Sequence, residues 1–176
     1  MTDLRKSKKL TQRYLRKRLN YNPDTGVFIW KSSSKMTKYW NTRYANKTAG
    51  CLTPNGYIII CIDRNDYLAH RLAFLWVKNL WPKYQIDHID GNPSNNKWSN
   101  LRQATSSQNQ FNCKLYENNK TGFKGVHLDT RSKTYHAQIS AYGKRIRIGG
   151  FATPNEAHLT LVQIRKNLHK EYGRDY

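Results

Sequence analysis

The sequence has few acidic residues. Only 11 Asp and Glu stand against 31 Lys and Arg, which gives the 176-residue chain a formal net charge of +20 at pH 7. A charge of this size indicates a polyanionic partner. Because the basic residues spread along the whole chain and no long apolar stretch accompanies them, nucleic acid is favoured over an anionic membrane surface. The alternative, that basic charge merely gives solubility, stays open at this point.

Cysteine is also scarce. Cys51, Cys61 and Cys113 are widely spaced and form no C-x-x-C pair, which argues against a zinc knuckle or ribbon and favours reduced thiols. Residues 1–9 are charged and lack the apolar segment of a secretory signal, and no run is long enough to span a membrane. We therefore expect a cytoplasmic protein that is not secreted.

Hydrophobic residues make up only 38% of the chain, so any cores are small, yet 12 Tyr and 5 Trp argue against disorder throughout. We expect an α+β protein with four parts: a basic N-terminal arm or helix at 1–20, a first domain at 21–112, a linker at 113–120 and a second domain at 121–176. The arm either contacts a nucleic-acid backbone or is a solvated helix packed weakly on the body, and its charge does not discriminate between these.

Apolar spacing and turn residues predict the elements of the first domain. Helices are expected from a Thr11 cap to Leu19 and over residues 69–79, and strands over residues 27–30 and, as a fully buried run, 57–62. Residues 31–47 are polar and basic, which predicts a long loop. The order strand, loop, strand, helix is expected from residue 85 onwards, and the T-x-x-Q spacing of Thr105 and Gln108 marks the start of that helix.

In the second domain we expect a three-stranded antiparallel sheet backed by one helix, with the other sheet face free. The strands are predicted at 124–128, 134–141 and 144–148, with a turn at Tyr142-Gly143. A capping box begins the helix at Thr153, and Gly173 can end it. The helix carries one apolar stripe, formed by Ala157, Leu161, Ile164 and Leu168.

Residues 85–112 place an acid, an imidazole and several amides close together. Asp87 and Asn109 offer hard oxygen donors that suit Mg²⁺ or Mn²⁺. His88 titrates near working pH and suits a general base that takes a proton from water. Together these groups meet the needs of phosphodiester hydrolysis. Neighbours in a regular strand point to opposite faces, so Asp87 and His88 serve one site only if the strand ends or distorts there.

A series of motifs at specific spacing resembles phage-type HNH endonucleases of the ββα-metal class, above all phage homing endonucleases. It runs through His70-Arg71-Leu72, Asp87-His88-Ile89-Asp90-Gly91-Asn92, Asn95-Asn96, Asn100-Leu101-Arg102 and Asn109. The resemblance implies that Asp87 and Asn109 hold one Mg²⁺ (or Mn²⁺) ion per active site. It also implies that His88 is the general base and that Asn100 ties the loop and orients the His.

Other polar residues of this region have more than one interpretation. We expect Arg71 and Arg102 to contact DNA. A His at the position of His70 is more often structural than functional, although helix N-termini attract phosphates. For Asn92, Asn95 and Asn96 we favour loop capping, because amides dominate turns.

The second domain resembles an AP2 DNA-binding domain in its segments 121–126, 135–139, 148–151 and 153–157. The resemblance implies that the sheet enters the major groove of DNA. The residues at its contact positions are Lys124, His127, Gln138, Ser140, Arg145 and Arg147. Independently, Arg145 and Arg147 alternate with Ile146 and Ile148, so the two Arg side chains share one face of a strand. The alternative is an edge strand protected by charge.

Taken together, the sequence predicts a metal-dependent endonuclease of the homing type that nicks double-stranded DNA. We expect a monomer without an obligate protein partner, acting in the cytoplasm of a phage's bacterial host. One rival interpretation is a DNA-binding regulator with an inactive nuclease core, against which Asp87, His88 and Asn109 argue. The other is an RNA-binding protein, for which the usual aromatic platform is not evident.

Overall fold

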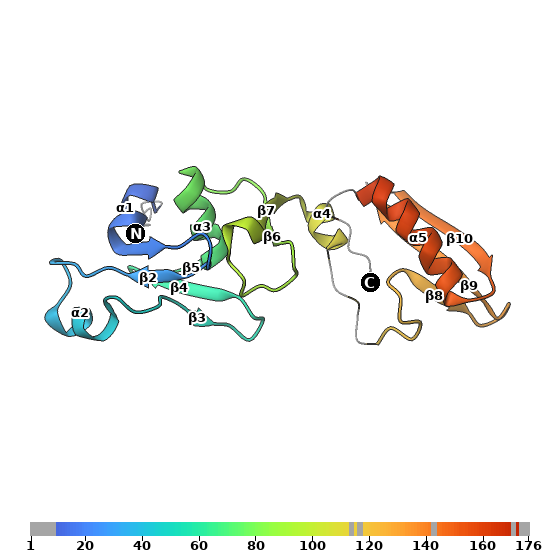
Figure 1. Cartoon of the computed structure of the whole chain (residues 1–176), viewed down its shortest axis with the longest axis horizontal. Helices are drawn as coiled ribbons and strands as arrows, with labels where there is room; N and C mark the ends of the chain where they lie inside the picture. Colours follow the sequence, from blue (N-terminus) through green and yellow to red (C-terminus); the bar gives the residue numbers. More distant parts are fainter. Residues whose placement is uncertain (1–9, 113–114, 116–117, 142–143, 170–171, 173–176) are drawn as a thin grey trace, which may run out of the picture. The chain divides into compact units, whose positions relative to one another are not determined.

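A computed structural model describes residues 10–112, 115, 118–141, 144–169 and 172 (Figure 1). The chain divides into two units, residues 1–103 and 104–176, and each is described by itself. This division falls ahead of the linker expected at 113–120, which lies partly outside the described residues, as does the start of the arm. The expected domain boundaries stay predictions. Antiparallel sheets and helices alternate in both units, so the α+β class is confirmed.

The first unit begins with the expected helix. In α1 (Gln12–Arg18) the Thr11 side chain accepts a hydrogen bond from the Tyr14 N–H, which satisfies one free donor of the first turn. The helix leads into β1 (Leu19–Tyr21), which pairs antiparallel with β2 (Phe28–Trp30). The predicted cap and strand are therefore confirmed.

The prediction of a long loop at 31–47 was wrong, because the segment contains α2 (Lys38–Tyr44). Thr37 caps this helix by accepting the Trp40 N–H. The Trp40 ring meets Trp30 edge to face with the centroids 5.3 Å apart. A single aromatic anchor fixes an otherwise polar helix, and a search for apolar periodicity overlooks such a helix.

A second antiparallel sheet has the order β3 (Cys51–Leu52), β4 (Ile58–Ile62) and β5 (Asn65–Leu68). We expected the run at 57–62 to be buried throughout. Instead Ile60 and Ile62 are buried while Cys61 is exposed. The continuous apolar sequence therefore belongs to a sheet with one covered face and one solvated face.

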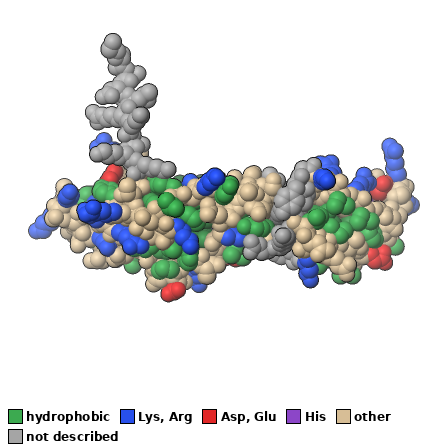
Figure 2. Space-filling view, turned by 90° about the horizontal axis from the view of Figure 1, so that it is seen from above, with side chains coloured by type: hydrophobic (Ala, Val, Ile, Leu, Met, Phe, Trp, Pro, Cys, Tyr) green, Lys and Arg blue, Asp and Glu red, His purple; other side chains and the backbone are tan. Residues whose placement is uncertain are grey.

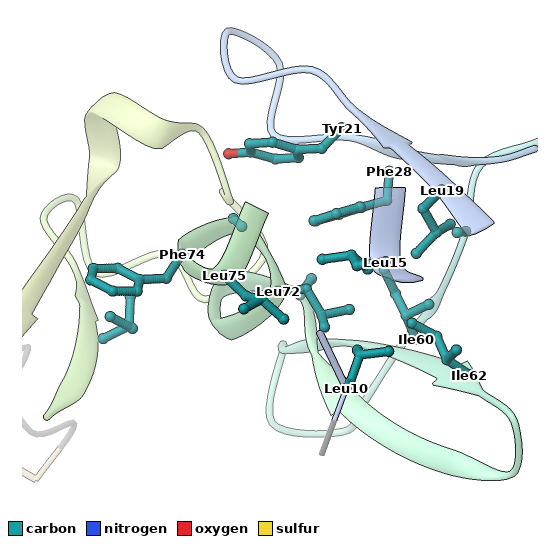
Figure 3. Packing of buried hydrophobic residues seen from close by; sticks show 14 of the residues in the cluster. Leu10, Leu15, Leu19, Tyr21, Phe28, Ile60, Ile62, Leu72, Phe74 and Leu75 are labelled. Atoms are coloured by element: carbon teal, nitrogen blue, oxygen red, sulfur yellow. The ribbon is translucent and has the colours of Figure 1, made fainter. Parts of the chain in front are cut away.

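Helix α3 (Ala69–Lys78) packs against this sheet and ends at Asn79, whose φ of 58° is left-handed. Its apolar side closes the core of the first unit (Figure 3). Leu15 of α1, Phe28 of β2 and Ile60 of β4 converge on Leu72 from this helix. Each of these four side chains is at most 2% exposed, so the core is small but dry.

The region after α3 follows the expected order of strand, loop, strand and helix. Its elements are β6 (Gln85–His88), the 3₁₀ turn η1 (Trp98–Asn100), β7 (Leu101–Ala104) and α4 (Ser106–Phe111). Strands β6 and β7 pair with each other. The capping box is confirmed, since the Thr105 N–H donates to Gln108 Oε1 and the Gln108 N–H donates to Thr105 Oγ1. By contact, α4 belongs to the second unit.

The second unit contains an antiparallel sheet of β8 (Val126–Asp129), β9 (Thr134–Ala141) and β10 (Lys144–Phe151), with β9 in the middle. Helix α5 (Pro154–His169) covers one face and contributes Ala157 and Leu161 to the core, as its apolar stripe predicts. Strand β10 extends past its predicted end at Ile148, because a register shift before Phe151 absorbs the two glycines. The predicted turn at Tyr142-Gly143 and the helix end at Gly173 lie outside the described residues.

One glycine, in the turn before β2, allows close packing of this turn against the loop between β6 and β7. Gly26 has a left-handed φ of +74°, and a Cβ there would meet Asn96 C and Lys97 N at 2.4 Å each. Both contacts are to backbone, which cannot move aside as a flexible side chain does. The first unit therefore tolerates only glycine at this position.

We expect Gly26→Ala to lower the free energy of unfolding of the first unit by about 2–4 kcal/mol, through left-handed strain and the backbone clash. Urea denaturation followed by Trp fluorescence measures this unit alone, because Trp30, Trp40, Trp76, Trp81 and Trp98 all lie within it. Gly122→Ala, in the second unit with open space around its Cβ, should leave this transition unchanged. A Gly26→Ala transition that coincides with wild type would contradict the packing argument.

Candidate active site

Strand β6 carries Asp87 and His88 as its last two residues, and each is only 5% exposed. The two side chains contact different groups: Asp87 bonds Arg102 of β7, whereas His88 bonds Asn96 in the loop that follows. The strand ends immediately after His88, as a shared site requires. Ile89 then donates its N–H to the Asn100 carbonyl at 2.9 Å.

The carboxylate of Asp87 forms a buried ion pair. Arg102 donates from both Nε and Nη2 to Asp87 Oδ2, each at 2.8 Å, and its own side chain is 15% exposed. In a buried setting this guanidinium supplies the charge that the carboxylate needs. We expected Arg102 on DNA; its contact with DNA stays a prediction, and the structure adds a role inside the first unit.

The hydrogen bond from His88 to Asn96 indicates which ring nitrogen carries the proton. His88 Nε2 lies 3.3 Å from Asn96 Oδ1, and the amide nitrogen of the same Asn donates to the Ser94 carbonyl at 3.1 Å. An amide oxygen only accepts, so Nε2 carries the hydrogen. The neutral ring then has its lone pair on Nδ1. Asn96, which we interpreted as a loop cap, therefore also positions the imidazole.

A second buried imidazole lies against the first. The rings of His70 and His88 are edge to face with centroids 5.0 Å apart, and Tyr57 lies 5.5 Å from His70 and 6.1 Å from His88. Burial, with the nearby His88 and Arg71 charges, lowers the pKa of His70 to about 3. Burial also lowers the pKa of His88, more than Asn96, Asp90 and Asp87 raise it. Both rings are therefore neutral near pH 7.

The loop between β6 and β7 is closed by amides. Asn100 Nδ2 donates to Asp90 Oδ1 and to the Asn95 carbonyl, both at 2.9 Å, while its Oδ1 accepts the Asp90 N–H at 3.0 Å. Burial raises the pKa of Asp90, but bonds from the Asn92 N–H and from the Asn95 and Asn100 amides outweigh it, so the net shift is downwards. Asn100 thus ties the loop, as expected, while Asn96 makes a side-chain hydrogen bond to His88. Its part in orienting the His stays a prediction.

Two other predicted residues have described contacts of their own. Asn109 is in α4, where its N–H donates to the Thr105 carbonyl at 2.9 Å. Because α4 is grouped with the second unit, its approach to Asp87 stays a prediction. Arg71 lies in α3 with its guanidinium 5.9 Å from the centre of the Trp81 ring.

Five of the six residues expected to contact DNA in the second unit, all except Lys124, share one sheet face. The register pairs Ser140 with Arg145 and Gln138 with Arg147, and alternation along β9 turns Ala137 and Ile139 into the core instead. On β8, His127 pairs with His136 on the same outer face, their rings stacked 5.2 Å apart. Lys124 precedes β8, and its carbonyl accepts a bond from Arg165.

Sequence reasoning missed three residues of these two sites. Asn96 was interpreted only as a cap, and Tyr57 was considered only as part of a strand. His136 was overlooked on the outer sheet face, although its spacing of two from Gln138 was a sufficient signal. Nothing local in the sequence brings Tyr57 to His88, because the chain folds back through α3 between them.

The donor chemistry at Asp87 suits a hard cation. Among the described residues, no group of three or more His, Cys, Asp and Glu side chains is placed to hold a metal. A cation at Asp87 would therefore take amide or carbonyl oxygens and water as its remaining ligands. Mg²⁺ and similar ions accept that set, since they retain several waters when bound.

We expect Arg102→Leu to lower the free energy of unfolding of the first unit by about 3 kcal/mol, because it leaves the Asp87 carboxylate buried without its partner. The double variant Asp87→Leu/Arg102→Leu should recover most of this loss, since no buried charge remains. Trp-monitored urea denaturation measures both. Equal losses in the single and double variants would show that the ion pair does not set the effect.

Comparison with known proteins identifies the region around this site. A family described as HNH endonuclease matches residues 67–111, which include Asp87, His88, Asn100 and Asn109. An uncharacterized HNH endonuclease of Acanthamoeba polyphaga mimivirus is 28% identical over 136 residues, covering 70% of this chain and 37% of that protein. No solved structure matches the chain.

A phage protein is matched over more of its own length. Protein 3.8 of Escherichia phage T7 is 32% identical over 93 residues, which are 52% of this chain and 74% of the phage protein. The match to the HNH endonuclease family and the similarity to the mimivirus protein support a nuclease. The chain belongs to the family of the phage T7 Protein 3.8 and carries an HNH endonuclease domain at residues 67–111.

Proposed function

We propose that the protein is a metal-dependent endonuclease of the homing type that nicks double-stranded DNA. The observation that carries this proposal is His88, a buried imidazole beside a buried carboxylate, fixed by Asn96 in one tautomer. A neutral ring with its lone pair on Nδ1 can take a proton from water. One such site in a monomer fits the cutting of one strand at a time.

The proposed division of labour follows from the contacts of each group. His88 Nδ1 removes the proton from the attacking water while Nε2–H stays on Asn96. Asn100 holds the loop that carries Asn96. Asp87 and Asn109 would hold a divalent cation, Mg²⁺ or Mn²⁺. When bound, that cation supplies positive charge to the scissile phosphate and the leaving oxygen.

Arg102 makes the carboxylate of Asp87 ready for this role. Its two bonds to Oδ2 hold the side chain in one rotamer inside the first unit. A ligand held in place before its ion arrives loses little freedom on binding. The contact of Arg102 with DNA remains part of the proposal, because a guanidinium beside the proposed metal ligand can also bind a phosphate.

We further propose that the β8–β9–β10 sheet anchors the enzyme on DNA in the manner of an AP2 domain. Support comes from His127, Gln138, Ser140, Arg145 and Arg147, which gather on the face opposite α5. A β-ribbon of this width can enter the major groove, where Arg bonds guanine through two donors. Lys124 adds a cation ahead of β8.

The site of action is proposed on similar grounds. One relative is encoded by a bacteriophage, and no helix among the described residues has the length and apolar character to cross a membrane. We place the activity in the cytoplasm of the bacterial host, where phage DNA replicates.

The test of the nuclease is conversion of supercoiled plasmid and phage genomic DNA with Mg²⁺, Mn²⁺ or EDTA. We expect metal-dependent nicking that His88→Ala slows by about 10²–10⁴-fold, the usual contribution of a general base. Ile89→Ala is the matched control, because Ile89 is the next residue after His88 and its side chain is 44% exposed. Linear plasmid as the product would show that the enzyme cleaves both strands and does not nick one. DNA binding without cleavage of either substrate would favour a regulator instead.

The test of the sheet is DNA affinity by fluorescence anisotropy, measured with His88→Ala so that the duplex stays intact. We expect Arg145→Ala to weaken binding and to reduce the slope of log K against log salt by about 1. Arg131→Ala removes another exposed Arg, from the turn between β8 and β9, and should change little. If both variants weaken binding equally, only net charge matters and the sheet is not the anchor.

A further inference from the structure

Two segments of the first unit carry positive charge without any acidic residue. Residues 10–20 and 31–50 contain nine Lys and Arg and no Asp or Glu. The whole chain, by comparison, has 11 acids for its 31 bases. The nine residues are Arg13, Arg16, Lys17, Arg18, Lys31, Lys35, Lys38, Arg43 and Lys47.

The structure joins these segments into one surface. The Lys31 N–H donates to the Arg18 carbonyl, and Lys31 Nζ donates to the Arg16 carbonyl, both at 2.9 Å. The Arg18 guanidinium lies 5.2 Å from the centre of the Trp40 ring in α2. Helices α1 and α2 lie at the same end of the unit (Figure 1), where Figure 2 shows Lys and Arg side chains gathered. We call residues 10–20 and 31–50 the α1–α2 surface.

Arg18 is a buried cation of α1 that packs against Trp40 of α2. Its residue is only 8% exposed, and its Nε is buried without a hydrogen-bond partner. The described ion pairs join Arg102 to Asp87 and Arg147 to Asp129, and none of them includes Arg18. Its guanidinium stacks on Trp30, 5.7 Å away, as well as on Trp40, which compensates it only in part. A desolvated cation of this kind favours an anion nearby.

Helix α2 adds two cations, Lys38 and Arg43, to this surface. None of its residues is buried, and Tyr39 is 71% exposed. Arg43 donates to the Tyr39 hydroxyl at 3.0 Å and lies 5.4 Å from the centre of the Tyr44 ring. Asn41 fastens the preceding loop by accepting from the Ser33 N–H and donating to its carbonyl. The Arg43 guanidinium is therefore held in place before any ligand binds.

We propose that the α1–α2 surface binds the phosphate backbone of duplex DNA, as a second contact region separate from the β8–β9–β10 sheet. This inference rests on the proposed function, which makes DNA the substrate. Arg, Lys and Tyr are the side chains that phosphate contacts commonly use. A purely solvated face mixes charges of both signs, because like charges repel one another. The two segments contain no acidic residue across 31 positions, and Asp63 from outside them accepts a hydrogen bond from the Tyr14 hydroxyl of α1. The remaining excess of cations favours a polyanion as partner.

The test compares two pairs of substitutions that each remove one Lys and one Arg from the first unit. Lys38→Gln/Arg43→Gln lies on α2, and Lys83→Gln/Arg64→Asn lies outside the surface; all four residues are exposed. Asn suits position 64, where φ is 64°. Each pair is placed in the His88→Ala chain, and anisotropy measures affinity for a mixed-sequence duplex over a range of salt.

We expect the α2 pair to weaken binding about tenfold and to reduce the salt slope by about 2, since each phosphate contact contributes about 0.9. The control pair should change affinity less than twofold, as charges outside the contact add little. Equal effects of the two pairs would overturn the proposal. A larger difference in affinity between the two pairs on an RNA duplex of the same sequence than on DNA would also overturn it, because the surface would then be assigned to RNA.

Cleavage by otherwise wild-type chains separates this inference from the proposed function. If the wild-type chain nicks plasmid while the two variant pairs bind DNA with equal affinity, only the proposal about the surface is overturned. Failure of the wild-type chain both to cut and to bind DNA would overturn the surface and the nuclease together. Circular dichroism of each pair checks that a loss of affinity reflects the removed charges and not a loss of fold.

Discussion

The closure of the β6–β7 loop by Asn100 is the constraint on which the rest of the candidate site depends. Its side chain bonds both ends of the loop, at Asp90 and at Asn95, so the chain between them has little freedom. This closure delivers Asn96 to His88 Nε2. Gly26 approaches the same stretch of backbone from the turn before β2. A set of amide hydrogen bonds, each worth only about 1 kcal/mol, thus fixes one tautomer of one imidazole.

Burial gives these groups their chemical character. His88 and Asp87 are each 5% exposed, and His70 lies against His88 with its pKa lowered chiefly by desolvation. A buried imidazole stays neutral, which a general base requires. A buried carboxylate needs a cation, and Arg102 supplies one. Adjacent residues of one strand therefore carry a neutral imidazole, on His88, and a carboxylate whose charge is paired with a guanidinium, on Asp87.

The excess of positive charge is divided among surfaces with different composition. The outer face of the β8–β9–β10 sheet combines Arg145 and Arg147 with His, Gln and Ser, which are side chains suited to base edges. The α1–α2 surface carries nine Lys and Arg together with the exposed Tyr14, Tyr39 and Tyr44, which suit phosphates. An enzyme that cuts one bond in a long polymer benefits from both kinds of contact, because one sets position and the other adds affinity.

The sequence by itself determined the elements with strong local signals. The Thr11 cap, the helix at 69–79, the capping box at Thr105 and the three-stranded sheet with its helix follow from periodicity and from cap residues a few positions apart. Motif spacing also marked Asp87 and His88. Three features were decided only by the tertiary structure. Helix α2 is anchored by one Trp–Trp contact, and Asp87 pairs with Arg102. His88 meets Asn96, His70 and Tyr57. These depend on loop closure and strand register, which join residues distant in the chain and leave no periodic trace in the sequence.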